Sequence, residues 1–286
     1  MMDMLRVKKV LNNNALIAEH PVYNEVVLLG KGIGFKKIAG DQITKAEVEK
    51  VFVLKNPEEQ RQYVELVHQV GEEFVALMNE AIAYVESMLN APLNEHIHVS
   101  LTDHLYFALK RIRDGVEIRN PFRLETELAY PLEYKVALKL AEWLQERLGL
   151  AIPEDEVGFI ALHIHCALSN AHISNVTKRT QLITQLVNIV ENAFKMPVDR
   201  NDINYFRFIR HLHFTIDRIE SGKYADDVGF LNEALQKECP LSYTLAWKLM
   251  KCMQNILKKP VPEAEAVYLT LHLQRLYNAI QAVGCN

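Results

Sequence analysis

The sequence predicts a multidomain protein in which a small N-terminal antiparallel β domain precedes two duplicated all-α helical-bundle domains. An internal repeat is the main observation. Residues 131–163 (PLEYKVALKLAEWLQERLGLAIPEDEVGFIALH) and 240–272 (PLSYTLAWKLMKCMQNILKKPVPEAEAVYLTLH) share Pro, Leu, Tyr, Ala, Lys, Leu, a second Pro, Glu-x-Glu and a closing Leu-His in one register. Upstream, residues 104–112 match residues 211–219 at nearly the same offset. Repeats of this length exceed solenoid units, so they indicate a duplicated globular domain.

The β domain is predicted from the first 55 residues, whose composition differs from the rest of the chain. Short β-rich runs alternate there with Asn and Gly clusters; the runs are residues 6–11, 15–18, 25–29, 30–35 and 51–54. We expect about four strands, in a domain over residues 1–59. Because so short a domain buries little apolar surface, we expect it to gain stability by dimerising.

The two helical domains are predicted over residues 60–172 and 173–286. A helix start at Asn56-Pro57, with acidic residues following, leads into one apolar pattern that continues to Met88 and ends at Asn90. A polar segment, residues 169–179, is predicted to link the two domains. The other expected helices cover residues 101–113, 132–148, 154–168, 181–194, 201–220, 241–257 and 263–282.

Composition limits the class of protein. Apolar residues make up 49% and charged residues 24%, which favours a folded chain. No apolar run reaches membrane-spanning length and no signal segment opens the chain, so we expect a cytoplasmic protein without stable membrane insertion. The four cysteines have neither CxxC spacing nor matching places in the repeats, which predicts reduced thiols and no bound cofactor or metal.

The N-terminal domain carries a basic excess. Residues 1–55 hold nine Lys or Arg against six Asp or Glu, or +3, although the whole chain is −4. An Asn cluster that includes Asn12 and Asn14, and a loop with Gly30 and Gly32, can be read simply as turns. The Asn run is nevertheless longer than a turn needs. Asn amides can bond base edges, and an aromatic ring among lysines suits irregular RNA; the ring and lysines are Phe35, Lys9, Lys31, Lys36 and Lys37.

Four histidines occupy matching places in the two copies: His104 with His211, and His163 with His272. A single histidine on a helix is usually a partly buried polar residue. Here both copies keep both histidines while much of the neighbouring sequence differs, which favours a functional role.

Three kinds of chemistry can be considered for these histidines. A metal site could use His104, His163 and nearby carboxylates, as in a His-Asp hydrolase, but Arg210 replaces Asp103 in the second copy. A catalytic dyad lacks a Ser or Cys nucleophile that recurs in register. The third possibility is that imidazole itself accepts a phosphoryl group. The chain has no P-loop or kinase-type glycine motif, so the donor would be external.

These features together resemble one family over essentially the whole chain. The stretches KVLNNN (residues 9–14) and GKGIGF (residues 30–35), followed by two helical copies with His in the contexts LTDH, ALH, IRH and TLH, resemble transcriptional antiterminators of the BglG/SacY type. That family carries two regulation domains of the sugar phosphotransferase system. A DNA-binding regulator with the same regulation domains is the alternative, but no helix-turn-helix pattern is present.

The resemblance implies a mechanism and a set of site residues. The N-terminal domain, as a homodimer, would bind a hairpin in a leader mRNA and prevent termination; the residues at the family's RNA contacts are Lys9, Asn12, Asn14, Gly30, Lys31, Gly32 and Phe35. His104 and His163 would be phosphorylated by a sugar permease of the phosphotransferase system, with glucose as the expected sugar. His211 and His272 would be served by the carrier protein HPr. The family is not enzymatic, and no DNA partner is implied.

Overall fold

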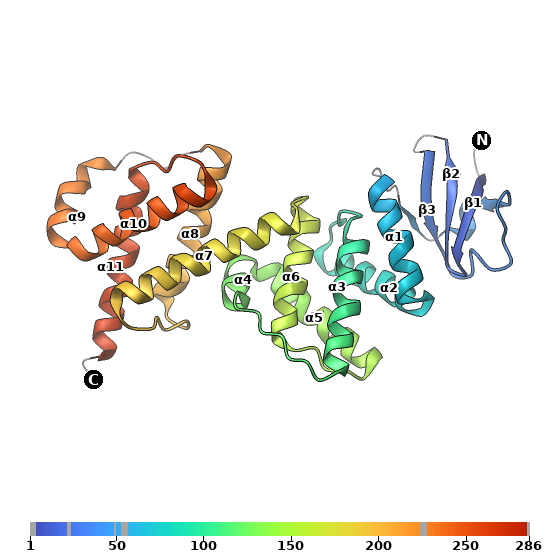
Figure 1. Cartoon of the computed structure of the whole chain (residues 1–286), viewed down its shortest axis with the longest axis horizontal. Coiled ribbons are helices and arrows are strands. Elements are labelled where there is room, and N and C mark those ends of the chain that lie inside the picture. The colour runs from blue at the N-terminus through green and yellow to red at the C-terminus, as the bar shows by residue number, and fades with distance from the viewer. Residues whose placement is uncertain (1–3, 22–23, 49, 53–56, 224–227, 285–286) are drawn as a thin grey trace. The chain divides into compact units, whose positions relative to one another are not determined.

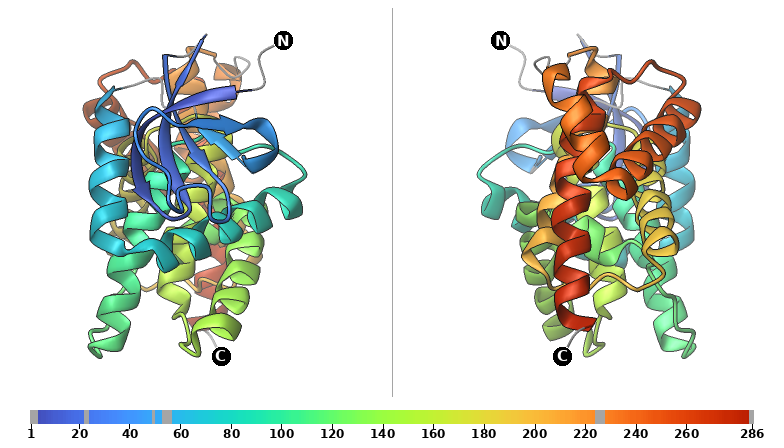
Figure 2. Two further views of the ribbon diagram at one scale, coloured as in Figure 1. Left: turned by 90° about the vertical axis from the view of Figure 1, so that its right-hand side faces the viewer. Right: turned by 90° about the vertical axis from the view of Figure 1, so that its left-hand side faces the viewer.

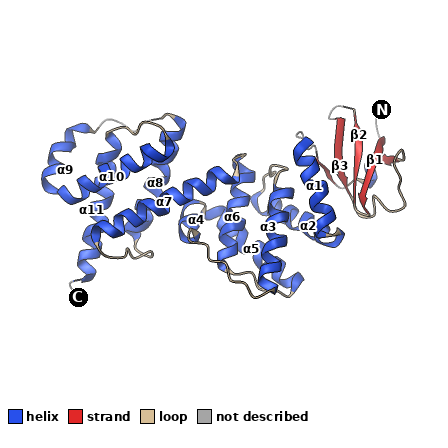
Figure 3. Ribbon diagram, in the orientation of Figure 1, coloured by secondary structure: helices blue, strands red, loops and turns tan. Residues whose placement is uncertain are grey.

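The computed structural model describes residues 4–21, 24–48, 50–52, 57–223 and 228–284. The chain divides into two compact units, one of residues 1–118 with 135–171 and the other of residues 119–134 with 172–286. Strands are confined to the N-terminal part of the described chain, and the rest is helical (Figure 3). The predicted fold class is therefore confirmed.

The first unit begins with an antiparallel sheet in the order β4-β1-β2-β3-β5. Its strands are β1 (Met4–Asn12), β2 (Ala15–His20), β3 (Asn24–Leu29), β4 (Gln42–Thr44) and β5 (Lys50–Phe52). The strand β4, three residues long, lies outside the predicted β-rich runs, whereas the predicted run over residues 30–35 contains no strand and is mostly turn. Leu54, in the last predicted run, lies outside the described residues, as does Asn56, which was predicted to start the first helix.

The central strand β2 is buried along Ala15–Ala18 because both faces of the sheet are covered. On one face its side chains join a cluster made within the sheet and its loop: Val7, Leu16, Ala18, Val26, Leu28, Ile33 and Ile43. On the other face, α1 (Pro57–Val70) runs alongside the sheet (Figures 1 and 2). The cluster there holds Leu11, Ala15, Ile17, Val27, Tyr63, Leu66, Val67, Val75 and Val99. The small sheet thus gains its second apolar layer from helices.

The helices of the first unit differ from prediction in two places. The single helix predicted up to Met88 is divided into α1 and α2 (Glu72–Leu89) by Gly71, whose φ of 84° and ψ of 159° interrupt the helix. The next helix, α3 (Ile97–Arg113), begins four residues before the predicted 101. The prediction for α6 (Glu154–Ser169) is confirmed to within one residue.

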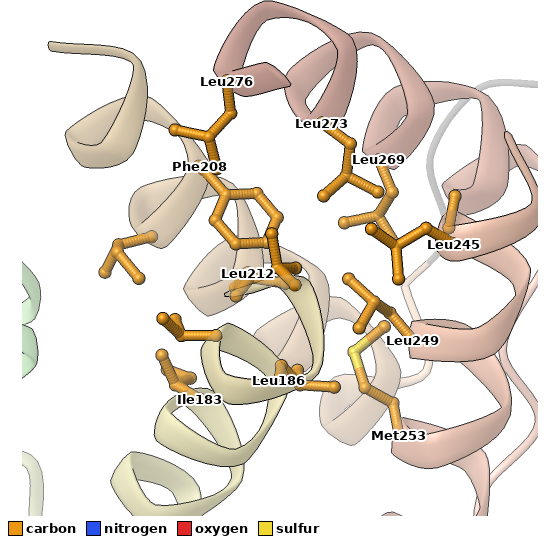
Figure 4. Close-up of a cluster of buried hydrophobic side chains, with 14 of the residues drawn as sticks. Ile183, Leu186, Phe208, Leu212, Leu245, Leu249, Met253, Leu269, Leu273 and Leu276 are labelled. Atoms are coloured by element: carbon orange, nitrogen blue, oxygen red, sulfur yellow. The ribbon is translucent and has the colours of Figure 1, made fainter. Parts of the chain in front are cut away.

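The second unit is organised around one large apolar core, part of which is drawn in Figure 4. Its helices are α4 (Arg123–Ala129), α7 (Ile173–Phe194), α8 (Ile203–Ser221), α9 (Asn232–Glu238), α10 (Pro240–Leu257) and α11 (Ala264–Gly284), with a 3-10 turn at Gly229–Leu231. The two seven-residue helices, α4 and α9, were not predicted. The predicted linker over 169–179 is wrong, because α7 already begins at Ile173.

Residues 119–134 group with the second unit, although the predicted boundary assigned them to the first helical domain. Within that unit α4 packs on α7 and α8. The buried carboxylate of Glu125 accepts hydrogen bonds from Arg200 Nη1 (2.7 Å) and from the Tyr205 hydroxyl (2.8 Å). Helix α5 (Pro131–Leu148) starts in the second unit and continues in the first. The boundaries 1–59, 60–172 and 173–286 stay a prediction.

Two further observations concern the described residues alone. None of their helices is both long and apolar enough to cross a membrane. Cys166, Cys239 and Cys252 are free thiols, and Cys285 lies outside the described residues.

Candidate functional site

The Asn turn and the Gly loop of the sheet are bonded to each other. Asn13 and Asn14 form the turn between β1 and β2. The Gly34 amide donates to the Asn13 carbonyl (2.9 Å), and the Gly30 amide donates to the Asn14 carbonyl (3.1 Å). The side-chain oxygen of Asn14 accepts a further bond from the Gly32 amide at 2.8 Å. Two segments that the sequence singled out separately therefore meet at one end of strands β1, β2 and β3, a surface that we call the Asn-Gly edge.

Glycine is required at two positions of this edge. A Cβ on Gly30 would lie 2.4 Å from the Glu47 carbonyl oxygen, so a side chain cannot be accommodated there. Gly32 has a φ of 71°, which lies in the left-handed region where glycine carries no steric penalty. Gly30 and Gly32 together therefore allow the loop to lie close to the Asn turn.

Phe35 presents its ring at this edge. Its side chain is 59% exposed, and its amide donates to the Gly32 carbonyl at 2.9 Å. The Lys36 ammonium lies 5.3 Å from the centre of the ring. An exposed aromatic ring beside cations is the arrangement on which a nucleic acid base can stack.

The lysines at this edge serve different purposes. Lys9 and Lys31 are exposed, as a phosphate contact requires. Lys37 instead pairs with Glu47 at 3.2 Å. Bonds from Thr44, followed by Lys37, lower the pKa of Glu47 to about 2. Lys37 therefore supports the loop, contrary to its predicted role as a free charge. The side chain of Asn12 lies outside the described set.

In the first helical copy, α3 and α6 bring His104 and His163 together, with ring centres 5.0 Å apart. Glu156, on α6, contacts His104, and its carboxylate is buried. His104 Nε2 lies 3.1 Å from Glu156 Oε2, and Arg111 Nη2 donates to Glu156 Oε1 at 3.1 Å. The sequence pairing of the two histidines is therefore a spatial pairing.

The second copy repeats this arrangement on α8 and α11. The rings of His211 and His272 stack with their centres 4.5 Å apart. Arg218 donates to both oxygens of the buried Glu265, through Nε (2.8 Å) and Nη2 (2.7 Å). Thr215 Oγ1 donates to Glu265 Oε2 at 2.9 Å and lies 3.3 Å from His211 Nε2. Two histidines, a buried glutamate and an arginine therefore form the same cluster in both copies.

Sequence reasoning missed the arginines and gave no role to Glu265. A signal was present: each first histidine is followed seven positions later by Arg111 or Arg218, and each second histidine is preceded seven positions earlier by a glutamate. Seven residues are two helical turns, so each pair shares a helix face. Repeated spacing within both copies could have identified the full set.

Burial keeps the imidazoles of His163 and His211 neutral. Burial lowers the pKa of His163 to about 3, with His104 contributing. Burial, then His272 and Arg218, lower the pKa of His211 to about 3. Burial would raise the pKa of Glu156, but contacts with His104 and Arg111 outweigh it and lower that pKa. A neutral imidazole keeps a lone pair and can act as a nucleophile.

The His104 and His211 side chains are 17% and 13% exposed, so both can be reached from solvent. Among the described residues no three His, Cys, Asp or Glu side chains are placed to hold a metal ion. Of the carboxylates considered as ligands on the sequence, Glu156 contacts His104 and Arg111, and Asp103 is exposed.

Comparison with known families decides the assignment. A model of the CAT RNA binding domain matches residues 5–61, and a model of the PRD domain matches residues 79–167 and 184–276. This chain belongs to the transcription antiterminators with one CAT and two PRD domains. In these terms the Asn-Gly edge lies in the CAT domain, and each PRD domain holds one histidine pair.

Two relatives match this chain over nearly its full length. The PtsGHI operon antiterminator of Bacillus subtilis (strain 168) is 50% identical over 96% of this chain and 98% of its own. Protein GlcT of Staphylococcus saprophyticus is 37% identical over 95% of this chain and 97% of its own. The crystal structure of GlcT CAT-PRDI matches with a TM-score of 0.54 and 49% identity, covering 58% of this chain and 99% of that one. The antiterminator is accordingly an RNA-binding regulator and not an enzyme.

Proposed function

We propose that this antiterminator stabilises a hairpin in the leader mRNA of a glucose phosphotransferase operon, under control of histidine phosphorylation. The observation that carries the control is the repeated cluster in which two histidines, a buried glutamate and an arginine meet in each PRD domain. The operon is inferred from the relative named PtsGHI operon antiterminator.

The RNA would bind along the Asn-Gly edge of the sheet. Phe35 offers its ring to an unpaired base, while Lys9 and Lys31 pair with phosphates. Gly32 lets the backbone approach the RNA closely. Because its side-chain oxygen already holds the Gly32 amide, Asn14 both shapes the loop and directs its amide group to the RNA. Asn12 and Gly30 complete the proposed contact set.

The proposed phosphorylation sites are His104, His163, His211 and His272. In the transfer, an imidazole nitrogen forms a bond to phosphorus, and the bond from phosphorus to the donor atom breaks. The donor keeps that electron pair, and the acceptor ring loses its proton. The depressed pKa values of His163 and His211 favour this reaction, because a protonated ring has no lone pair.

Phosphorylation of the first PRD domain would weaken its α3–α6 contact. A phosphoryl group adds about −1.5 to −2 charges. Placed on His104 it would repel Glu156, which lies 3.1 Å from the unmodified ring, and compete for Arg111. Because α3 also carries Val99 into the core beneath the CAT sheet, its displacement would reach the RNA-binding domain.

The proposed phosphoryl donors are other proteins of the phosphotransferase system. A sugar permease (enzyme II) would phosphorylate His104 and His163 when sugar is absent, and HPr would act on His211 and His272. The active form would be a homodimer in the cytoplasm. The functional domains would be residues 1–59, 60–172 and 173–286.

The test uses the full chain with purified phosphotransferase proteins and phosphoenolpyruvate. We expect phosphohistidine at His104 or His163, detected by mass spectrometry under neutral conditions, and loss of leader-hairpin binding in a gel-shift assay. The matched control His165→Ala should behave as the parent chain, since His165 lies on α6 but has no counterpart in the other copy. A chain that takes no phosphate, or whose phosphorylation leaves RNA binding unchanged, would contradict the proposal.

A further inference from the structure

The two histidine pairs differ in the charge that surrounds them. At three positions that correspond between the copies, the second PRD domain has arginine and the first does not. The positions, with the first-domain residue before its counterpart, are Ser100 and Arg207, Asp103 and Arg210, and Cys166 and Arg275. The otherwise matched clusters thus differ in the positive charge that lies around them.

Two of these arginines lie on the same faces as the histidines. Arg207 precedes His211 by four residues on α8, and Arg275 follows His272 by three residues on α11. Residues at these spacings are neighbours on a helix surface. Long helical side chains lean toward the helix N-terminus, which carries Arg275 over His272. Since the two rings stack at 4.5 Å, Arg207 and Arg275 each lie about one turn from the same ring pair, on two different helices.

Both arginines are available to a ligand. Each is exposed, and no ion pair engages either of them within the described ranges. No acidic residue occurs three or four positions from either one along its helix. Arg218, by contrast, donates hydrogen bonds to both carboxylate oxygens of Glu265. Burial lowers the pKa of His272 most, and the charges of Arg275 and Arg207 lower it further. Both charges therefore act on this ring.

We propose that Arg207 and Arg275 form a clamp for the phosphoryl group of phosphohistidine at His272, a device that the first PRD domain lacks. The clamp rests on the proposed function, because it needs a phosphorylated second domain. A guanidinium offers two donors in a fork that matches phosphate oxygens. Drawn by the phosphoryl group, the two arginines would hold α8 and α11 together. In the first domain Ser100 and Cys166 stand at the corresponding positions, so that domain has no such clamp.

The clamp can be tested without any protein donor. Phosphoramidate phosphorylates imidazole: the new nitrogen–phosphorus bond forms, the old one breaks, ammonia leaves and the ring loses its proton. The full chain carrying His104→Ala and His163→Ala would be labelled in this way, so that the second domain alone retains its pair. The ³¹P resonance that disappears in His272→Ala is assigned to His272, and the pKa of that phosphoryl group is read from its chemical shift as the pH is varied. A neighbouring cation lowers that pKa because it favours the dianion.

We expect Arg207→Ala with Arg275→Ala to raise the phosphoryl pKa by about 0.5 to 1 unit. The double variant Arg207→Lys, Arg275→Lys should keep most of the lowering of the phosphoryl pKa. Arg210→Ala is the matched control, since Arg210 is exposed but points to another side of α8, and should change the value by less than half as much. Equal values with and without the two arginines would overturn the clamp. Failure of phosphotransferase proteins to label the chain, while phosphoramidate does, would instead contradict the proposed function.

Discussion

Val99 and His104 lie on the same helix, α3, yet they serve different parts of the first unit. Val99 packs into the apolar cluster that α1 and the sheet share, whereas His104 contacts Glu156 on α6. One rigid helix therefore links the proposed phosphorylation site to the layer beneath the RNA-binding sheet. Coupling between these two places needs no long chain of side-chain contacts, because a rigid helix transmits a displacement along its whole length.

Removal of the exposed ring at the Asn-Gly edge should weaken RNA binding. Phe35→Ala should lower affinity for the leader hairpin by about 5- to 150-fold, which corresponds to about 1–3 kcal/mol for the loss of one stacked base. Fluorescence anisotropy with labelled hairpin measures this directly. Phe230→Ala is the matched control, since Phe230 is 81% exposed in the second PRD domain. An unchanged affinity for Phe35→Ala would count against the RNA assignment.

The sequence predicted the repeat, the β domain and the pairing of the histidines because these depend on residue spacing within one chain. It missed what depends on tertiary partners. Gly71 interrupts a helix whose apolar pattern is continuous, because α1 turns away to cover the sheet. Helix α4 is too short to show a period, and Glu125 finds its partners Arg200 and Tyr205 far along the chain. Arg111 and Arg218 were missed although their equal spacing from the first histidine of each copy gave a signal, because their buried carboxylate partners lie on another helix.

His104→Ala should leave the antiterminator active when sugar is absent. Without an acceptor at this position the first PRD domain cannot gain the charge that repels Glu156. We expect reporter read-through without sugar to rise to nearly the level seen with sugar. His165→Ala should keep normal regulation. Sugar dependence that survives His104→Ala would refute an inhibitory role for His104.

Mild acid should destabilise the fold through the buried imidazoles. The folded-state pKa values of His163 and His211 are about 3, against 6.5 for the free side chain, so the unfolded chain binds more protons between these values. Stability therefore falls as the pH drops below 6.5 and is regained as it rises. At pH 5 each histidine should cost up to about 2 kcal/mol.

The pH effect is measured by the shift in urea midpoint from pH 7 to pH 5. The double variant His163→Asn, His211→Asn should show a shallower dependence than the parent chain. This window lies above the pH at which protonation of Glu156 removes its own contribution, because the pKa of that group is lowered. An identical pH dependence in both proteins would contradict the burial of neutral rings.

The attachment of α4 to the second unit should depend on one carboxylate. Glu125→Ala removes the acceptor of Arg200 and Tyr205 and should cost about 2–3 kcal/mol in the local opening of α4, since Arg200 keeps its bond to Glu191. Hydrogen exchange of the amides in Arg123–Ala129 reports this. Glu127→Ala, at an exposed position on the same helix, should have little effect. Equal exchange rates in the two variants would show that the buried bonds do not fix α4.

The most direct measurement is single-round transcription through a leader with its terminator, using the full chain before and after phosphorylation by phosphotransferase proteins. The account predicts that the unmodified protein increases read-through, that phosphorylation at His104 or His163 abolishes the increase, and that the His104→Ala, His163→Ala variant stays active under both conditions. Read-through by the parent chain that does not respond to phosphorylation, or an unmodified protein that leaves termination unchanged, would contradict it.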